Sequence, residues 1–363
     1  MKICIGVDLH KTQFTVYARS ETGIYGKFLT NSEGYAQFLG QLETWRSEGH
    51  TIRLGVESTG NTRYFKNRME QAGHEVVVIN TLKFKVVNES VKKTDKHDAA
   101  TIAEFLEKDM LPESRLCSET SEQLRRYLAV RKTLVRTIVS VKNQIHALLV
   151  SLGMEDCKAS LQSKRGRQEV LATLEKAAFG LEVHPLFETI ERLTEEVKRM
   201  EKHLEKLTTG DRVVELLQTI DGCGPITAWT IRAHTDDIKR FASYKKYSAY
   251  AGLAPWVQCS NETVHYGSIT KRGPEELRTA LVQLVLGMVR NQKTTASYRI
   301  MIRHQALKAV KGNGKSIVAT ARKLSKVIWY MLTYDKPFDP SLMIDKKIEQ
   351  KTEDMQASLK LPA

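Results

Sequence analysis

Four acidic residues stand where predicted strands end and a predicted helix begins. Asp8 ends the first apolar run of the chain, Glu57 ends a later one, and Asp95 and Asp98 open a predicted helix. Strands that each end on an acid bring those acids to one edge of a sheet, and acids spaced like the last two share one helix face. Converging carboxylates repel one another unless a divalent cation neutralises them, and their oxygens suit Mg²⁺ or Mn²⁺. The sequence therefore predicts a metal site suited to phosphodiester chemistry.

Each of these acids also has a purely structural interpretation. Acids are common at strand ends and in the first turn of helices, because free backbone N–H groups and the helix dipole favour negative charge there. The order strand-Asp, strand-Glu and then helix Asp-x-x-Asp favours one joint site over independent structural roles.

The N-terminal third alternates short apolar runs with amphipathic segments. The pattern predicts a mixed five-stranded sheet in the order strand 2–8, strand 13–19, strand 26–30, helix 32–45, strand 51–57, helix 62–72 and strand 75–79. Three strands in a meander, followed by alternating helix and strand, are the order found in ribonuclease-H-like nucleases. Such a likeness predicts a fold, and the function must still be argued from the site.

Two later stretches carry apolar residues at alternating steps of three and four. One lies in a long helix predicted over 120–152 and the other spans 186–207, and the connection between them contains a short helix. These heptad seams predict two helices packed as a coiled coil, either within one chain or between chains.

The first long helix is also strongly basic. It has no acidic residue between Leu124 and Leu152, and its cations are Arg125, Arg126, Arg131, Lys132, Arg136 and Lys142. A solvated helix face usually mixes both signs of charge. Contact with nucleic-acid phosphates is therefore favoured over simple exposure.

Positive charge is concentrated outside the N-terminal third. Residues 1–112 contain 15 Lys/Arg and 14 Asp/Glu, whereas residues 113–341 contain 37 and 24, a balance of +13 in a chain of net charge +14. The asymmetry predicts a polyanionic partner, with nucleic acid as the first candidate and a merely basic protein as the alternative.

Nothing in the sequence predicts a membrane or secreted protein. The five cysteines form no Cys-x-x-Cys pair, which argues against zinc and a disulfide framework and fits a reducing cytoplasm. No apolar run approaches the roughly 18 residues of a membrane span. The chain starts directly with a strand and lacks the cleavage site of a signal peptide. We expect a cytoplasmic, nucleoid-associated protein.

From Asp211 onward the pattern is mainly helical, with helices predicted over 275–290 and 315–333. Residues 217–228 show the glycine turn of helix-hairpin-helix modules, in which backbone N–H groups can hold a phosphate, although a plain helix–helix turn fits almost as well. The chain is thus divided into an α/β domain over 1–112, a helical coiled-coil region over 113–210, a mainly α C-terminal domain over 211–340 and a flexible tail over 341–363.

Several short motifs together resemble one family of transposases. Residues 6–8, 56–60 and 93–99 are similar to the Asp-Glu-Asp-Asp domain of the insertion-sequence family IS110, including its IS1111 branch and the related Piv-type pilin-gene invertases. Residues 220–224 resemble the family's glycine turn, and residues 251–278 contain its second signature. Each motif is short, but the combination is specific and covers about residues 3–335.

The resemblance implies a composite mechanism. A RuvC-like domain would bind divalent metal through the acids named above, and the C-terminal domain would supply a serine nucleophile. By motif position this serine is Ser260, followed by Asn261 where the family usually has glycine, and Ser268 is a nearby alternative. Candidate phosphate contacts beside it, which a solvated surface would explain equally well, are Lys271, Arg272 and Arg278.

The resemblance also implies partners. The family is associated with a structured noncoding guide RNA from the end of the element, which pairs with donor and target DNA. Recombination holds two DNA partners together, so we expect a homo-oligomer, either a dimer or a tetramer.

Two other classes of function stay open. One is a metal-dependent nuclease or Holliday-junction resolvase, in which water attacks the phosphate and Ser260 is structural. The other is a nucleic-acid-binding scaffold or repressor without catalysis, against which the four acids count. A covalent protein–DNA adduct would separate the recombinase from the nuclease.

Overall fold

The computed structural model describes residues 2–19, 23–81, 83–84, 94–154, 160–176, 180–260 and 263–343. The chain forms two compact units, Met1–Cys117 and Ser118–Ala363, which we call unit 1 and unit 2. The finer division into four segments stays a prediction, and the predicted tail lies almost entirely outside the described residues.

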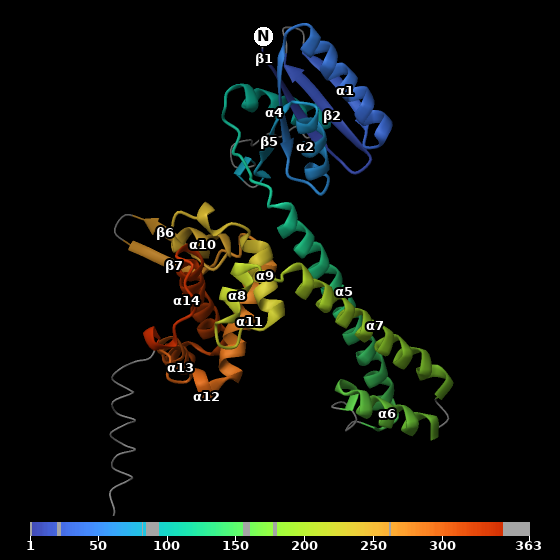
Figure 1. Ribbon diagram of the computed structural model, residues 1–363, viewed down its shortest axis with the longest axis vertical. Coiled ribbons are helices and arrows are strands. Elements are labelled where there is room, and N and C mark those ends of the chain that lie inside the picture. Colours follow the sequence, from blue (N-terminus) through green and yellow to red (C-terminus); the bar gives the residue numbers. More distant parts are fainter. Residues whose placement is uncertain are drawn as a thin grey trace, which may run out of the picture. The chain divides into compact units, whose positions relative to one another are not determined.

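Unit 1 is built on a mixed five-stranded sheet (Figure 1). Its strands are β1 Lys2–Leu9, β2 Gln13–Arg19, β3 Ile24–Leu29, β4 Thr51–Glu57 and β5 Glu75–Ile79. They lie in the order β3-β2-β1-β4-β5, antiparallel from β3 to β1 and parallel from β1 to β5. The predicted meander, followed by strands that alternate with helices, is confirmed.

Helices cover both faces of this sheet. On one face, α1 Ser32–Ser47 and α2 Thr62–Gln71 enclose a buried cluster of aromatic rings around Phe14. On the other face, α4 Asp95–Glu107 packs on β1 and β4 through Ile102 and Leu106. Side chains alternate between the two faces along a strand. Odd positions of β1 therefore belong to the aromatic core, and even positions face α4.

Unit 2 begins with a helical hairpin. The helices α5 Glu119–Ser151 and α7 Gly180–Leu207 lie side by side, with α6 Lys164–Lys176 between them in the sequence (Figure 1). They run antiparallel, because the rings of Tyr127 and His203 are in contact at one end while Ile145 shares a buried cluster with Val183 at the other. The two helices thus pack together within one chain, and the coiled-coil geometry of their seams stays a prediction.

The rest of unit 2 is a helical bundle with one β-hairpin. Its helices are α8 Arg212–Gln218, α9 Pro225–Thr235, α10 Tyr244–Tyr250, α11 Glu275–Arg290, α12 Gln292–Thr295, α13 Arg299–Lys311 and α14 Asn313–Thr333, with single 3₁₀ turns at Ile238–Arg240 and Pro340–Leu342. A further 3₁₀ turn, Ser160–Gln162, precedes α6 in the helical hairpin. Leucines of α11 and α14 fill its core. The hairpin consists of β6 Pro255–Ser260 and β7 Thr263–Ile269, and the sequence analysis predicted neither strand.

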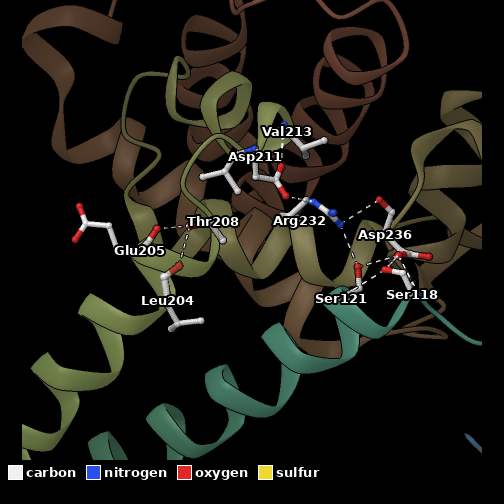
Figure 2. Close-up of polar contacts among 10 residues, drawn as sticks. Ser118, Ser121, Leu204, Glu205, Thr208, Asp211, Val213, Arg232 and Asp236 are labelled. Atoms are coloured by element: carbon white, nitrogen blue, oxygen red, sulfur yellow. Dashed lines mark hydrogen bonds and ion pairs between the residues drawn. The ribbon is translucent and has the colours of Figure 1, made fainter.

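A polar network ties the start of α5 to the bundle (Figure 2). Asp236 accepts hydrogen bonds from the Ser118 and Ser121 hydroxyls at 2.5 and 2.8 Å. Arg232 of α9 donates to Ser121 at 3.0 Å and to Asp211, the N-cap of α8, at 2.7 Å. The network therefore fixes how α5 is docked against α8 and α9.

Candidate active site

Asp8 and Glu57 lie at the same edge of the unit 1 sheet. β1 and β4 are parallel, and the last residues paired in their register are Val7 and Val56. The next residue on each strand is one of the two acids. Val7 and Val56 both belong to the aromatic core, so Asp8 and Glu57 are directed to the opposite face, which α4 covers.

A close helix–strand contact brings the other two acids to this edge. α4 packs on β1 at Gly6, where a Cβ atom would collide with the backbone carbonyl of Ala99. The helix starts at Thr94, whose hydroxyl caps it by accepting from the His97 backbone N–H at 3.2 Å. Asp95 and Asp98 are therefore held in its first turn, where the helix dipole favours negative charge.

Three side chains form a group that could hold a metal ion. One ligand atom each from Asp8, His10 and Asp95 lies within 4.8 Å of the others. His10 Nε2 is 3.1 Å from Asp8 Oδ2 and 3.8 Å from Asp95 Oδ1. Glu57 and Asp98 are not part of this three-atom group. The Asp8 and Asp95 oxygens suit a hard divalent cation such as Mg²⁺ or Mn²⁺, whereas an imidazole nitrogen is the softer ligand of the three.

The electrostatics of Asp8 fit such an ion. Burial raises the pKa of this carboxyl, His10 lowers it, and the charges of Asp95 and Asp98 raise it further. Negative charge is therefore crowded around a carboxylate that is only 13% exposed. A cation among these residues would relieve the repulsion.

His10 is the residue that the sequence analysis missed at this site. A signal was present, because His10 stands two positions after Asp8, and alternate residues of an extended chain share one face. His10 was not predicted, because only acidic residues were considered as ligands.

The candidate nucleophile lies in unit 2, in the β6–β7 hairpin. The backbone of Ser260 pairs with Thr263 at the end of the hairpin next to its turn. Ser268 lies on β7 near the opposite end, beside the pair Pro255 and Ile269. At roughly 3.3 Å per residue, the backbones of the two serines are about 16 Å apart along the hairpin. They would present a hydroxyl at clearly different places.

Two of the three cations of the second signature lie in the turn after the hairpin, and the third, Arg278, lies on α11. Lys271 and Arg272 are exposed. Arg278 donates from Nη1 to the Lys271 carbonyl at 3.1 Å and so stabilises the turn. Gly273, with φ of 114°, lies where a Cβ would collide with the Tyr250 carbonyl. The glycine of the motif is thus required for the backbone to pack closely here.

The six cations predicted on α5 mostly have partners within the fold. Arg125 donates to the Ala233 carbonyl at 2.9 Å, and Lys142 donates to Gln162 at 3.1 Å. Ion pairs join Arg126 to Glu122, Arg131 to Glu201 and Lys132 to Glu276. Among the described residues, only Arg136 of the six has no such partner.

The glycine turn predicted as a helix-hairpin-helix motif lies between α8 and α9. Gly222 has φ of 85°, and a Cβ there would lie 2.5 Å from the Gly287 carbonyl carbon of α11. The glycines therefore allow close backbone packing. The turn borders a hollow of about 600 Å³ that Arg290 also lines.

Comparison with known proteins identifies the family. Residues 5–154 match a family described as "Transposase", and residues 214–299 match the "Transposase IS116/IS110/IS902 family". The chain belongs to the IS110 family of transposases. Both candidate halves of the site, the acids of unit 1 and the hairpin of unit 2, lie within the matched segments.

Individual relatives cover nearly the whole chain. A probable family 20 transposase of Pseudomonas aeruginosa is 26% identical over 93% of this chain and 98% of its own length. The transposase of insertion sequence element IS1111A from Coxiella burnetii is 24% identical, over 92% and 90%. The pilin gene-inverting protein of Moraxella bovis is 25% identical, over 93% and 98%. The predicted resemblance to transposases and pilin-gene invertases is confirmed.

None of the helices in the described part of the chain combines the length and apolar character needed to cross a membrane.

Proposed function

We propose that this chain cuts and rejoins DNA strands, using a metal site in unit 1 and a serine nucleophile in unit 2. The observation that carries the proposal is the convergence of Asp8 and Asp95, with His10 between them, at one edge of the unit 1 sheet. The order of the strands and helices in unit 1 supports a ribonuclease-H-like, RuvC-like fold.

The residues that would hold the ion are Asp8, Glu57, Asp95 and Asp98, with His10 as a further ligand. Bound Mg²⁺ or Mn²⁺ would supply positive charge that stabilises a phosphate under attack. The protein contributes placement, because the packing of α4 at Gly6 and the cap at Thr94 fix the helix that carries two of the acids.

Ser260 is the proposed nucleophile. Its oxygen forms a bond to phosphorus while the bond from phosphorus to one DNA oxygen breaks, and the serine proton passes to the departing oxygen or to a base. A hydroxyl of another strand then attacks the phosphoserine and releases the serine. The phosphodiester energy is conserved in the covalent link, so rejoining needs no nucleotide cofactor.

The family resemblance supports two further parts of the proposal. A structured noncoding RNA from the element would pair with donor and target DNA and so select the sites. At least two copies of the chain would hold the two DNA partners together, as a dimer or a tetramer.

Substitution of the acids tests the metal site. Asp8→Asn and Asp98→Asn should abolish strand cleavage in Mg²⁺ and leave DNA binding within a few fold, because the amide keeps the shape and removes the charge. Glu43→Gln is a matched control, since Glu43 is a largely exposed acid on α1 of the same unit. Full cleavage by either aspartate variant would contradict the proposal.

A denaturing gel with labelled DNA tests the serine. Ser260→Ala should lose the covalent adduct and keep DNA binding, whereas Ser268→Ala on the same hairpin should keep the adduct. Loss of the adduct only in Ser268→Ala would assign the nucleophile to Ser268. Hydrolysis without any adduct, unaffected by both variants, would instead support the nuclease or resolvase in which water attacks.

A further inference from the structure

One surface of unit 2 combines positive charge with exposed aromatic rings. A groove of about 1380 Å³ lies between α10, β7, α13 and α14, and we call it the α14 groove. A second hollow of about 1000 Å³ is lined by α13, by α14 and by the segment after it. The two hollows share Arg303, Lys323 and Lys326, so they form one continuous surface.

The charge of this surface is almost entirely positive. From Leu277 to Tyr334 the chain has no acidic residue. The α14 groove itself is lined by Lys245, Lys311, Lys315 and Arg322 in addition to the three shared cations, and by no acid. In the described part of the chain, none of these seven side chains forms an ion pair. Their charges are therefore available to an anionic ligand.

Three tyrosines form a stacked row beside these cations. The rings of Tyr244 and Tyr330 are 6.2 Å apart at 29°, and those of Tyr330 and Tyr334 are 5.9 Å apart at 15°. Lys326 Nζ lies 4.8 Å from the Tyr244 ring centre and 5.7 Å from that of Tyr330. Tyr330 and Tyr334 are 41% and 59% exposed, so packing within the fold does not account for this row.

This combination suits unpaired nucleotides better than a duplex. Proteins that bind single strands place phosphates on cations along a groove and stack bases on aromatic faces. In a duplex each base is already stacked on its neighbours, so its faces are not free to stack on tyrosine rings. Phosphate contacts alone would need only the cations.

We propose that the α14 groove and the second hollow beside it bind a single-stranded segment of DNA. Bases would stack on Tyr330 and Tyr334 of the second hollow, and phosphates would contact Lys323 and Lys326, which line both hollows. The proposal rests on the proposed strand-rejoining function, because a cut strand must leave its complement before it can be joined elsewhere. The tyrosines and lysines named in the proposal lie beyond the two matched family segments. The side of the α14 groove that α10 and β7 form, which includes Ser268, lies within the second matched segment.

Equilibrium binding by the full-length protein tests the proposal. The probes are a fluorescent 12-nucleotide single-stranded DNA, the same sequence as a duplex, and the same sequence as RNA, all with a chelator so that no cleavage occurs. The double variant Tyr330→Ala/Tyr334→Ala should bind the single-stranded DNA roughly 10–100-fold more weakly, as expected for lost base stacking. Its affinity for the duplex should stay within about two-fold.

The salt dependence separates the two kinds of contact. The tyrosine variant should keep the wild-type slope of log affinity against log salt, because stacking displaces no counterions. Lys323→Gln/Lys326→Gln should reduce the slope for the single strand by roughly 1.4, about 0.7 for each lost phosphate contact. Lys308→Gln, a cation of α13 that lines neither hollow, is the matched control and should bind like wild type. Tyr330→Phe keeps the ring and should also bind like wild type.

Three outcomes would overturn the inference. They are equal losses for the single strand and the duplex in the tyrosine variant, no loss at all while the variant keeps its melting temperature, and a loss of RNA affinity in the tyrosine variant more than ten-fold larger than its loss of single-stranded DNA affinity. None of these outcomes bears on the proposed cleavage and rejoining of DNA strands, because the binding assay involves no cleavage. Failure of the Asp8 and Ser260 tests would likewise leave this binding measurement unaffected.

Discussion

Two basic helical regions of unit 2 have similar charge patterns, but their cations lie in different surroundings. Neither α5 from Leu124 onward nor the α13–α14 region contains an acidic residue. On α5, the cations reach acids and carbonyls of other elements, such as Glu201 of α7 and Ala233 of α9. On α13 and α14, the cations that line the α14 groove form no ion pair among the described residues.

The difference shows what local charge patterns leave out. A run of cations without nearby acids predicts a phosphate-binding face only if no acid arrives from elsewhere in the fold. The acids that pair with α5 lie about 70 and 144 positions away in the sequence. Tertiary packing thus gives most of the α5 cations partners within the fold, whereas the cations of the α14 groove have no ion-pair partner among the described residues. The phosphate contacts predicted for α5 stay a prediction.

Charge reversal should separate the two regions most strongly. Arg322→Glu/Lys323→Glu/Lys326→Glu should weaken DNA binding about a thousand-fold at low salt, because three phosphate contacts become repulsions. Arg136→Glu, at the α5 cation without a partner, should weaken it about five-fold at most. Fluorescence anisotropy with one labelled DNA measures both. Comparable losses in the two variants would restore α5 as a main binding face.

The polar network that docks α5 on the bundle should be the place where a substitution lowers stability most. Arg232 and Asp211 form an ion pair in which the side chains are only 16% and 18% exposed (Figure 2). Arg232→Met leaves Asp211 without its partner and should lower the free energy of unfolding of unit 2 by about 3 kcal/mol. Urea unfolding checks this value. Arg212→Met is the control, because Arg212 pairs with Asp335 on the surface and its loss should lower stability much less than the loss of Arg232. Equal costs would show that the network does not anchor α5.

His234 should make the docking of α5 sensitive to acid. Burial, together with the charges of Arg125 and Lys132 of α5, lowers its pKa to about 4, and Glu276 partly opposes this shift. The unfolded chain binds this proton near pH 6.5. Stability is therefore full above about pH 6.5 and is lost as the pH falls towards 4, by up to about 3 kcal/mol.

Hydrogen exchange of α9 at pH 7 and pH 4.5 measures this loss of stability. His234→Asn, which cannot take up a proton, should flatten the pH dependence, and His265→Gln on the exposed hairpin should leave it unchanged. A pH response that persists in His234→Asn would place the acid sensitivity elsewhere.

Regular patterns made much of the fold predictable. The strands of unit 1 and the long helices α5 and α7 were predicted within a few residues, because apolar residues repeat there with the period of a strand or a helix. The β6–β7 hairpin and α13 were not predicted. The described side chains of the hairpin are mostly exposed, and α13 buries only Met301 and His304, so neither shows a clear apolar repeat. Tertiary contacts decide both.

The candidate site was predictable to a similar degree. A shared edge for Asp8 and Glu57 followed from parallel strands that end on acids. The approach of α4 depends on Gly6, whose partner Ala99 lies 93 positions away, and no local rule relates the two. The partners of the α5 cations were hidden for the same reason.

The weakest expected effect concerns the ion pair between Lys132 and Glu276. Their atoms are 3.3 Å apart, and the side chains are 41% and 45% exposed, so solvent screens much of the attraction. Burial raises the pKa of Glu276, but its own backbone N–H and Lys132 outweigh burial and leave that pKa lowered. The pair therefore adds stability above about pH 4.5, which is lost as the pH falls further.

A double-mutant cycle with Lys132→Ala and Glu276→Ala at pH 7 should give a coupling of about 0.5 kcal/mol, which disappears in 1 M salt. If Lys132 serves the fold in this way, Lys132→Ala leaves DNA affinity within two-fold. A ten-fold loss of affinity with no coupling would instead make Lys132 a phosphate contact, and the contrast between α5 and the α14 groove would fail at that residue.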